Sequence, residues 1–125
     1  MPYAPLIARI LVGGMFVMAG ISKITGFAGT VAFATSVGLP APQLAIIIAI
    51  LIEILGGLSV LLGYRIKWGA GALALFTIAA AVIFHADFAN QMQQTLFVKN
   101  LAITGALLYM MRFGAGLLSL DAKKQ

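Results

Sequence analysis

The sequence predicts an all-α integral membrane protein, a four-helix bundle with a short interfacial helix between the first and second spans. Hydrophobic residues make up 62% of the 125-residue chain and charged residues only 9%, whereas an average soluble domain is roughly 25% charged. A soluble domain this short exposes much of its surface and could not cover it with eight basic and three acidic side chains. Four apolar segments also approach the roughly 20 residues that a helix needs to cross a bilayer.

The four predicted spans are separated by polar residues, glycine and proline. They cover about residues 5–22, 43–62, 68–84 and 96–113. Gly38, Pro40 and Pro42 precede the second span, where they disfavour a continuous helix. Because the chain has no room for a second unit of this kind, we expect residues 1–125 to form a single membrane domain.

The connection between the first two spans has an amphipathic pattern of its own. Phe27, Val31, Phe33 and Val37 recur at helical spacing, which predicts a short helix at the membrane interface. Residues 87–95 are rich in Asn and Gln and are expected to form an exposed loop. The first span lacks a basic N-terminal region, so we expect it to be retained and not cleaved as a signal peptide.

Basic residues near the span ends predict the orientation. Arg65 and Lys67 lie in the short connection between the second and third spans, and Arg112 lies near the C-terminus, close to the tail lysines 123 and 124. The positive-inside rule predicts that this side, with both termini, is cytoplasmic, although Lys23 and Lys99 on the opposite side weaken the bias. The expected location is a bacterial inner membrane, crossed several times.

Glu53 is a single carboxylate in the middle of the second apolar span. A charge at the centre of a membrane helix costs about 2.5–3.5 kcal/mol on insertion scales, so such residues usually face the interior of a bundle. The small residues around it follow at spacings of three and four: Ala45, Ala49, Gly56 and Gly57. This face permits close helix approach and predicts that Glu53 meets a neighbouring helix and not lipid.

A basic partner for Glu53 is expected on the first span. Arg9 and Lys23 lie about 40° apart in azimuth and roughly 21 Å apart along one helix stripe, with Phe16 between them. Arg9 is the preferred partner because its axial gap to Glu53 is about 9 Å, which a long guanidinium side chain can mostly cover. Lys23 and Lys99 are the second choice. The pair either orders the bundle or serves a proton, substrate or quinone role.

A second polar cluster is expected at the outer end of the bundle. It contains Lys23, His85, Asp87, Lys99 and Asn100. His85 and Asp87 are two residues apart and point some 200° apart in a helix, so no metal site is predicted. His85 either forms interfacial hydrogen bonds or lies in an outer-leaflet pocket, where it exchanges protons or binds a polar head group. The candidate walls of that pocket are Phe16, Phe84, Phe88 and Phe97.

Composition narrows the chemistry. The chain has no cysteine, which excludes disulfides, thiolate metal sites and a catalytic thiol, so redox chemistry would belong to a cofactor or a partner. The net charge of +5 comes from scattered residues that flank apolar segments, so we expect a lipid bilayer as partner and no nucleic acid. The methionines lie mostly within spans, which indicates packing and not copper binding.

Several motifs together resemble the DoxX family of small bacterial inner-membrane proteins. They are the first span from Arg9 to Lys23, Gly38-Leu39-Pro40, Glu53 with Gly56-Gly57, Phe84-His85, Phe97-Val98-Lys99-Asn100 and Ser119-Leu120-Asp121. The resemblance implies a four-helix membrane protein associated with thiosulfate and quinone oxidoreduction or with oxidative-stress complexes. It also marks Arg9, Lys23, Glu53, His85, Lys99 and Asn100 as the residues to test.

Three roles remain open at this point. The favoured one is a membrane subunit or scaffold that serves a redox-protein partner and has no stand-alone enzyme activity. In the second role, the bundle binds a quinone or another lipophilic molecule through its buried charges. The third is a carrier of a small solute or of protons, for which four spans would require a homo-oligomer.

Overall fold

The computed structural model describes residues 3–84 and 89–122 and contains, within these ranges, five helices and no strand. The helices are α1 (Tyr3–Thr25), α2 (Phe27–Ser36), α3 (Pro42–Leu62), α4 (Ile66–Phe84) and α5 (Gln91–Phe113). Four of them, α1, α3, α4 and α5, are long and apolar enough to cross a membrane. The predicted all-α membrane bundle is therefore confirmed, with the short helix α2 between the first two spans.

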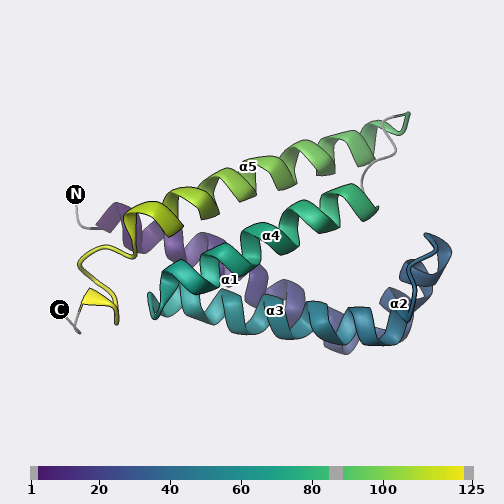
Figure 1. The fold of residues 1–125 in the computed structure, drawn as a ribbon, viewed down its shortest axis with the longest axis horizontal. Helices are drawn as coiled ribbons and strands as arrows, with labels where there is room; N and C mark the ends of the chain where they lie inside the picture. The colour runs from purple at the N-terminus through teal and green to yellow at the C-terminus, as the bar shows by residue number, and fades with distance from the viewer. Residues whose placement is uncertain (1–2, 85–88, 123–125) are drawn as a thin grey trace.

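The long helices form two pairs, and contacts between α3 and α4 join the pairs. α1 packs along α3, α4 packs along α5, and α3 also contacts α4 (Figure 1). The start of α1, the turn between α3 and α4 and the segment after α5 lie together at one end, which we call the terminal end. The opposite end carries α2 and is called the α2 end. The buried apolar cluster lies mainly toward the terminal end, with Val60, Ile66, Leu73 and Leu107 at its centre.

Many large apolar side chains are exposed on the outside of the bundle, as a membrane protein requires. Met18, Leu75 and Tyr109 are 72%, 74% and 67% exposed. In water such a surface would be unstable, whereas lipid accepts it. These exposed faces agree with a helix bundle whose outer surface contacts acyl chains.

The fourth long helix begins at Gln91, so residues 91–95 are helical and the predicted loop 87–95 was wrong for them. The Asn90 side chain accepts hydrogen bonds from the backbone N–H groups of Met92, at 2.9 Å, and Gln93, at 3.3 Å. An N-cap of this kind satisfies N–H groups that a helix start leaves unpaired. The polar composition that suggested a loop is therefore the first turn of a capped helix.

Glycines set how closely α1 and α3 approach. A Cβ atom on Gly13 would lie 2.7 Å from the Leu61 backbone nitrogen and 2.8 Å from the Gly57 carbonyl oxygen. Gly57 meets α1 in the same way, because a Cβ there would lie 3.0 Å from the Gly13 carbonyl oxygen. Backbone atoms cannot move aside as a flexible side chain can, so these glycines hold the two helices at backbone contact.

We expect Gly13→Ala to destabilise the bundle by about 1–3 kcal/mol, because the added methyl group forces α1 away from α3. The measurement is the midpoint of SDS-induced unfolding. Gly14→Ala is the matched control, since a Cβ on Gly14 meets no atom within 4 Å and alanine favours the helix by roughly 1 kcal/mol. Equal loss of stability in both variants would contradict the proposed backbone contact.

Candidate functional site

The α2 end holds a cavity of about 590 Å³ that is lined by residues from all five helices. Ligand pockets commonly have volumes of about 300–1,000 Å³. Its walls are mainly apolar and include Met15, Phe16, Phe33, Ile46, Ile48, Phe76, Ile83, Phe84, Leu96 and Ile103. Among the described residues, its polar lining consists of Lys23, Thr30, Glu53, Thr77, Lys99 and Asn100. This combination makes the cavity the candidate functional site.

An ion pair crosses from α1 to α3 on the wall of this cavity. The Lys23 Nζ atom lies 2.7 Å from Glu53 Oε1, and the two side chains are 27% and 4% exposed. Gly20 lies about one turn before Lys23 and permits this contact, because its lack of a side chain lets α1 approach α3. A Cβ atom on Gly20 would lie only 2.5 Å from the Ile54 side chain. Lys23 thus neutralises a carboxylate that is almost completely removed from solvent.

The preferred pairing of Arg9 with Glu53 was wrong, and Lys23 from the second choice takes that place. Contacts of Gly13 with Leu61 and Gly57, and of Gly20 with Ile54, set the register of the two helices. Arg9 consequently lies level with Leu61, roughly 12 Å along α3 from Glu53. The sequence supplied both cations on one stripe but not the axial offset between the helices.

Arg9 instead holds the terminal end together. Its side chain is buried, with 2% exposure, and it donates to the Leu61 carbonyl at 3.1 Å and to the Leu118 carbonyl. Gly63 leaves room for it, since a Cβ there would lie 2.6 Å from Arg9 Nη1. Gly63 also has φ +67°, which glycine adopts without strain at the end of a helix. Arg9 therefore links α1, the end of α3 and the C-terminal segment.

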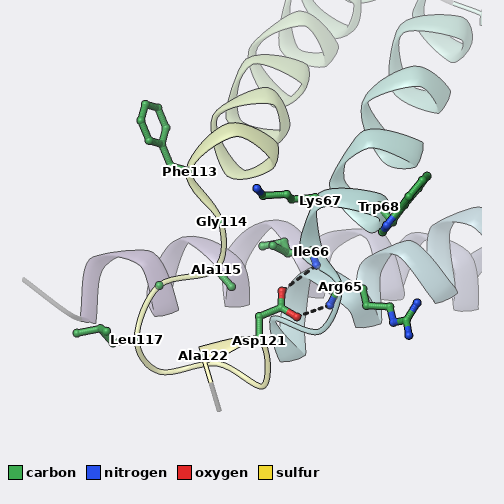
Figure 2. A pocket seen from close by; sticks show the side chains of 11 residues that line it. Arg65, Ile66, Lys67, Trp68, Phe113, Gly114, Ala115, Leu117, Asp121 and Ala122 are labelled. Atoms are coloured by element: carbon green, nitrogen blue, oxygen red, sulfur yellow. Dashed lines mark hydrogen bonds between the residues drawn. The ribbon is translucent and has the colours of Figure 1, made fainter. Parts of the chain in front are cut away.

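Asp121 completes this link from the C-terminal side. Its carboxylate accepts from the backbone N–H groups of Arg65, at 2.6 Å, and Ile66, at 3.0 Å, where α4 begins (Figure 2). The backbone N–H groups of Leu120 and Asp121 donate to the carbonyls of Leu62 and Gly63 at 3.2 and 2.8 Å. Sequence reasoning noted Asp121 only within a motif. A carboxylate placed after the last span, near a short turn between helices, was the available signal for this role.

A second hollow of about 660 Å³ lies beside this link. Figure 2 shows Lys67 and Phe113 on one side of the α4 start and Arg65 and Trp68 on the other, with Asp121 bonded beneath. Trp68 is 80% exposed and lies at the end of a candidate span, where aromatic residues commonly meet the lipid head groups. The polar contacts of Arg9 and Asp121 at this end join separate chain segments.

The predicted site residues are only partly brought together. Lys23, Glu53, Lys99 and Asn100 share the α2-end cavity, as do the walls Phe16 and Phe84. Phe97 does not line it, and His85 and Phe88 lie outside the described residues. Within residues 3–84 and 89–122, no group of three His, Cys, Asp or Glu side chains is placed to hold a metal ion.

Two aromatic residues that sequence reasoning missed also line the cavity. Phe33, from α2, stacks on Phe84, from α4, with ring centroids 5.6 Å apart and an interplanar angle of 25°. Phe76 lines the wall about two turns before Phe84 on α4. The helical pattern that includes Phe33 predicted its helix, but only the docking of α2 beside the α4 end places its ring at the cavity.

Three known proteins are similar to this chain over most of its length or a large part of it. Inner membrane protein YqjF of Escherichia coli K12 is 40% identical over 116 residues, which cover 93% of this chain and 88% of that protein. Inner membrane protein YphA of the same organism is 36% identical over 127 residues, covering 98% and 91%. A Bacillus subtilis 168 protein named "Putative oxidoreductase CatD" is 36% identical over 78 residues, covering 62% and 56%.

Residues 4–86 match the DoxX family. This region contains Arg9, Lys23 and Glu53, whereas Lys99 and Asn100 lie beyond it. No solved structure matches the chain. With its four apolar helices and its inner-membrane relatives, the chain is a multi-pass inner-membrane protein that belongs to the DoxX family.

Proposed function

We propose that the α2-end cavity binds a lipophilic small molecule with a polar head group, and that quinones are the first class to test. The observation that carries this proposal is the cavity itself, which combines apolar walls with a small set of charged and amide side chains. Pockets for small ligands typically have this composition, because apolar walls supply affinity and a few polar groups fix orientation.

The side chains suit a ring that carries carbonyl oxygens. The lysine ammonium groups of Lys23 and Lys99 and the Asn100 amide are donors, and quinone carbonyls are acceptors. The stacked rings of Phe33 and Phe84 offer an aromatic wall. Among the described lining residues Glu53 is the carboxylate, and its ion pair with Lys23 forms a charged part of the wall beside a bound head group.

A short-chain quinone added to the detergent-purified protein should raise its thermal unfolding midpoint. At a ligand concentration of 100 times Kd, binding to the folded state contributes about 2.7 kcal/mol. Ala80→Phe, which fills part of the cavity, should remove the shift, whereas Leu75→Phe on the exposed face of α4 should retain it. If no quinone co-purifies and none changes the midpoint, the quinone proposal fails.

A membrane-subunit role is the second proposal. It is favoured by the relative from Bacillus subtilis, whose name describes an oxidoreductase and which aligns with 62% of this chain. In this role the chain would present its bundle to a redox-protein partner. The third role, a solute carrier, would require a homo-oligomer. Crosslinking in native membranes tests the proposal, and recovery of the chain without a stable partner would count against it.

The orientation is also a proposal. Arg65 and Arg112 lie at the terminal end, close to the ends of candidate spans, which favours a cytoplasmic location for that end and for both chain termini. We further propose that residues 1–125 act as one membrane domain.

A further inference from the structure

We propose that the α2-end cavity prefers ligands whose head group is an anion, so that its ligand class is a lipophilic acid, and that Lys99 is the residue that selects the charge. This inference rests on the proposed function, because it names the ligand class of the same cavity. It goes further in predicting that a neutral head group, such as that of a quinone, binds less tightly than a carboxylate on a chain of equal length.

The first argument is the charge balance of the lining. Lys23 and Glu53 are held 2.7 Å apart and neutralise each other. Glu53 is the only carboxylate among the described residues that line the cavity, but Lys99 is a second ammonium group there. Apart from the Lys23–Glu53 pair, the described lining therefore carries one unbalanced positive charge, that of Lys99.

The second argument is the position of Lys99. It lies on α5 roughly 12 Å from the first residue of the helix and farther from the last. α5 is a candidate membrane span, and Lys99 lies in its half nearer the α2 end, where it is exposed at the cavity. Among residues 3–84 and 89–122, no carboxylate comes within 4.0 Å of it. A charge in such a place is costly unless an opposite charge accompanies it, and a bound anion would supply that charge.

The third argument is the chemistry next to Lys99. Asn100 also lines the cavity, so an ammonium group and a carboxamide are contributed by adjacent residues of α5. A carboxylate has two acceptor oxygens and can receive hydrogen bonds from both. The apolar walls formed by Phe16, Ile83 and Ile103 provide room for the hydrocarbon chain. Glu53 does not oppose the anion, because Lys23 already compensates its charge.

The test compares three probes that have the same twelve-carbon chain: dodecanoate, dodecanol and dodecylammonium. Each is titrated into the full-length protein in nanodiscs of neutral phospholipid, and binding is measured by native mass spectrometry. We expect dodecanoate to bind at least tenfold more tightly than dodecanol, and dodecylammonium to bind most weakly. Lys99→Met should reduce dodecanoate affinity about tenfold, with little effect on dodecanol, and Lys99→Arg should retain the preference.

Lys67→Met is the matched control, because it removes an exposed lysine at the terminal end, away from this cavity. It should leave all three affinities unchanged. The thermal midpoint of each ligand-free variant verifies folding, and Lys99→Arg keeps the test interpretable if Lys99→Met is unstable. If dodecanoate, dodecanol and a short-chain quinone all fail to bind, the proposed function fails. If the neutral probes bind as tightly as dodecanoate, the ligand function stands and the charge preference is overturned. If Lys99→Met leaves the dodecanoate affinity unchanged, the role of Lys99 as the selecting residue is overturned.

Discussion

Replacing Lys23 by methionine should destabilise the protein by about 3–5 kcal/mol, because it leaves the buried Glu53 carboxylate without its cation. The Glu53 side chain is only 4% exposed, so water cannot replace the lost ammonium group as its partner. Glu53→Gln should cost less, since the Lys23 side chain that it leaves behind is 27% exposed and can extend toward the opening of the cavity. The order of the two effects follows from this difference in burial.

The double variant Lys23→Met/Glu53→Gln separates pairing from packing. It should be more stable than Lys23→Met alone, because neither side chain then carries an unpaired charge. The midpoint of SDS-induced unfolding measures all three variants, with Lys67→Met as a control that removes an exposed lysine at the other end. Wild-type stability in Lys23→Met, or strictly additive losses in the double variant, would refute the direct pair.

Replacing Arg9 by methionine should cost about 3 kcal/mol and should loosen the C-terminal segment. The change removes two charge-assisted hydrogen bonds, to the carbonyls of Leu61 and Leu118, and hydrogen bonds of this kind contribute roughly 1.5–3 kcal/mol each. The effect should be local at first, because the Asp121 carboxylate and the backbone N–H groups of Leu120 and Asp121 would still hold the segment at the turn between α3 and α4.

Two measurements together test this role of Arg9. The unfolding midpoint should fall, and the residues after Phe113 should become accessible to protease under native conditions. Arg112→Met is the matched control, since Arg112 is exposed and its guanidinium contacts the Phe113 ring at 5.1 Å. Equal protease sensitivity in both variants would contradict the link. Ligand binding at the α2 end should survive Arg9→Met, because Arg9 does not line that cavity.

The charged residues at the two ends of the bundle have different contacts. At the terminal end, Arg9 and Asp121 use their charges on backbone groups of neighbouring segments. At the α2 end, Lys23, Glu53 and Lys99 place their charged groups on the wall of a cavity.

Much of the fold follows from local sequence. Apolar segments of sufficient length predict helices that cross a membrane, and Pro42 and Gly63 mark the two ends of α3. The predicted face of that helix was Ala45, Ala49, Glu53, Gly56 and Gly57. All of these residues are buried except Ala45, which is half-buried and lines the cavity. These properties depend on neighbours three and four residues apart, so a single chain segment contains all the information that they need.

The tertiary structure alone decided which groups meet. Helical periodicity placed Arg9 and Lys23 on the same face but left open how far α1 slides along α3. Backbone contacts at Gly13 and Gly57, and the contact of Gly20 with the Ile54 side chain, set that offset. The sequence by itself determined a membrane bundle with buried charges on small-residue faces. Only packing assigned Lys23 to Glu53 and Arg9 to the terminal end, because axial register depends on contacts between residues that are far apart in the chain.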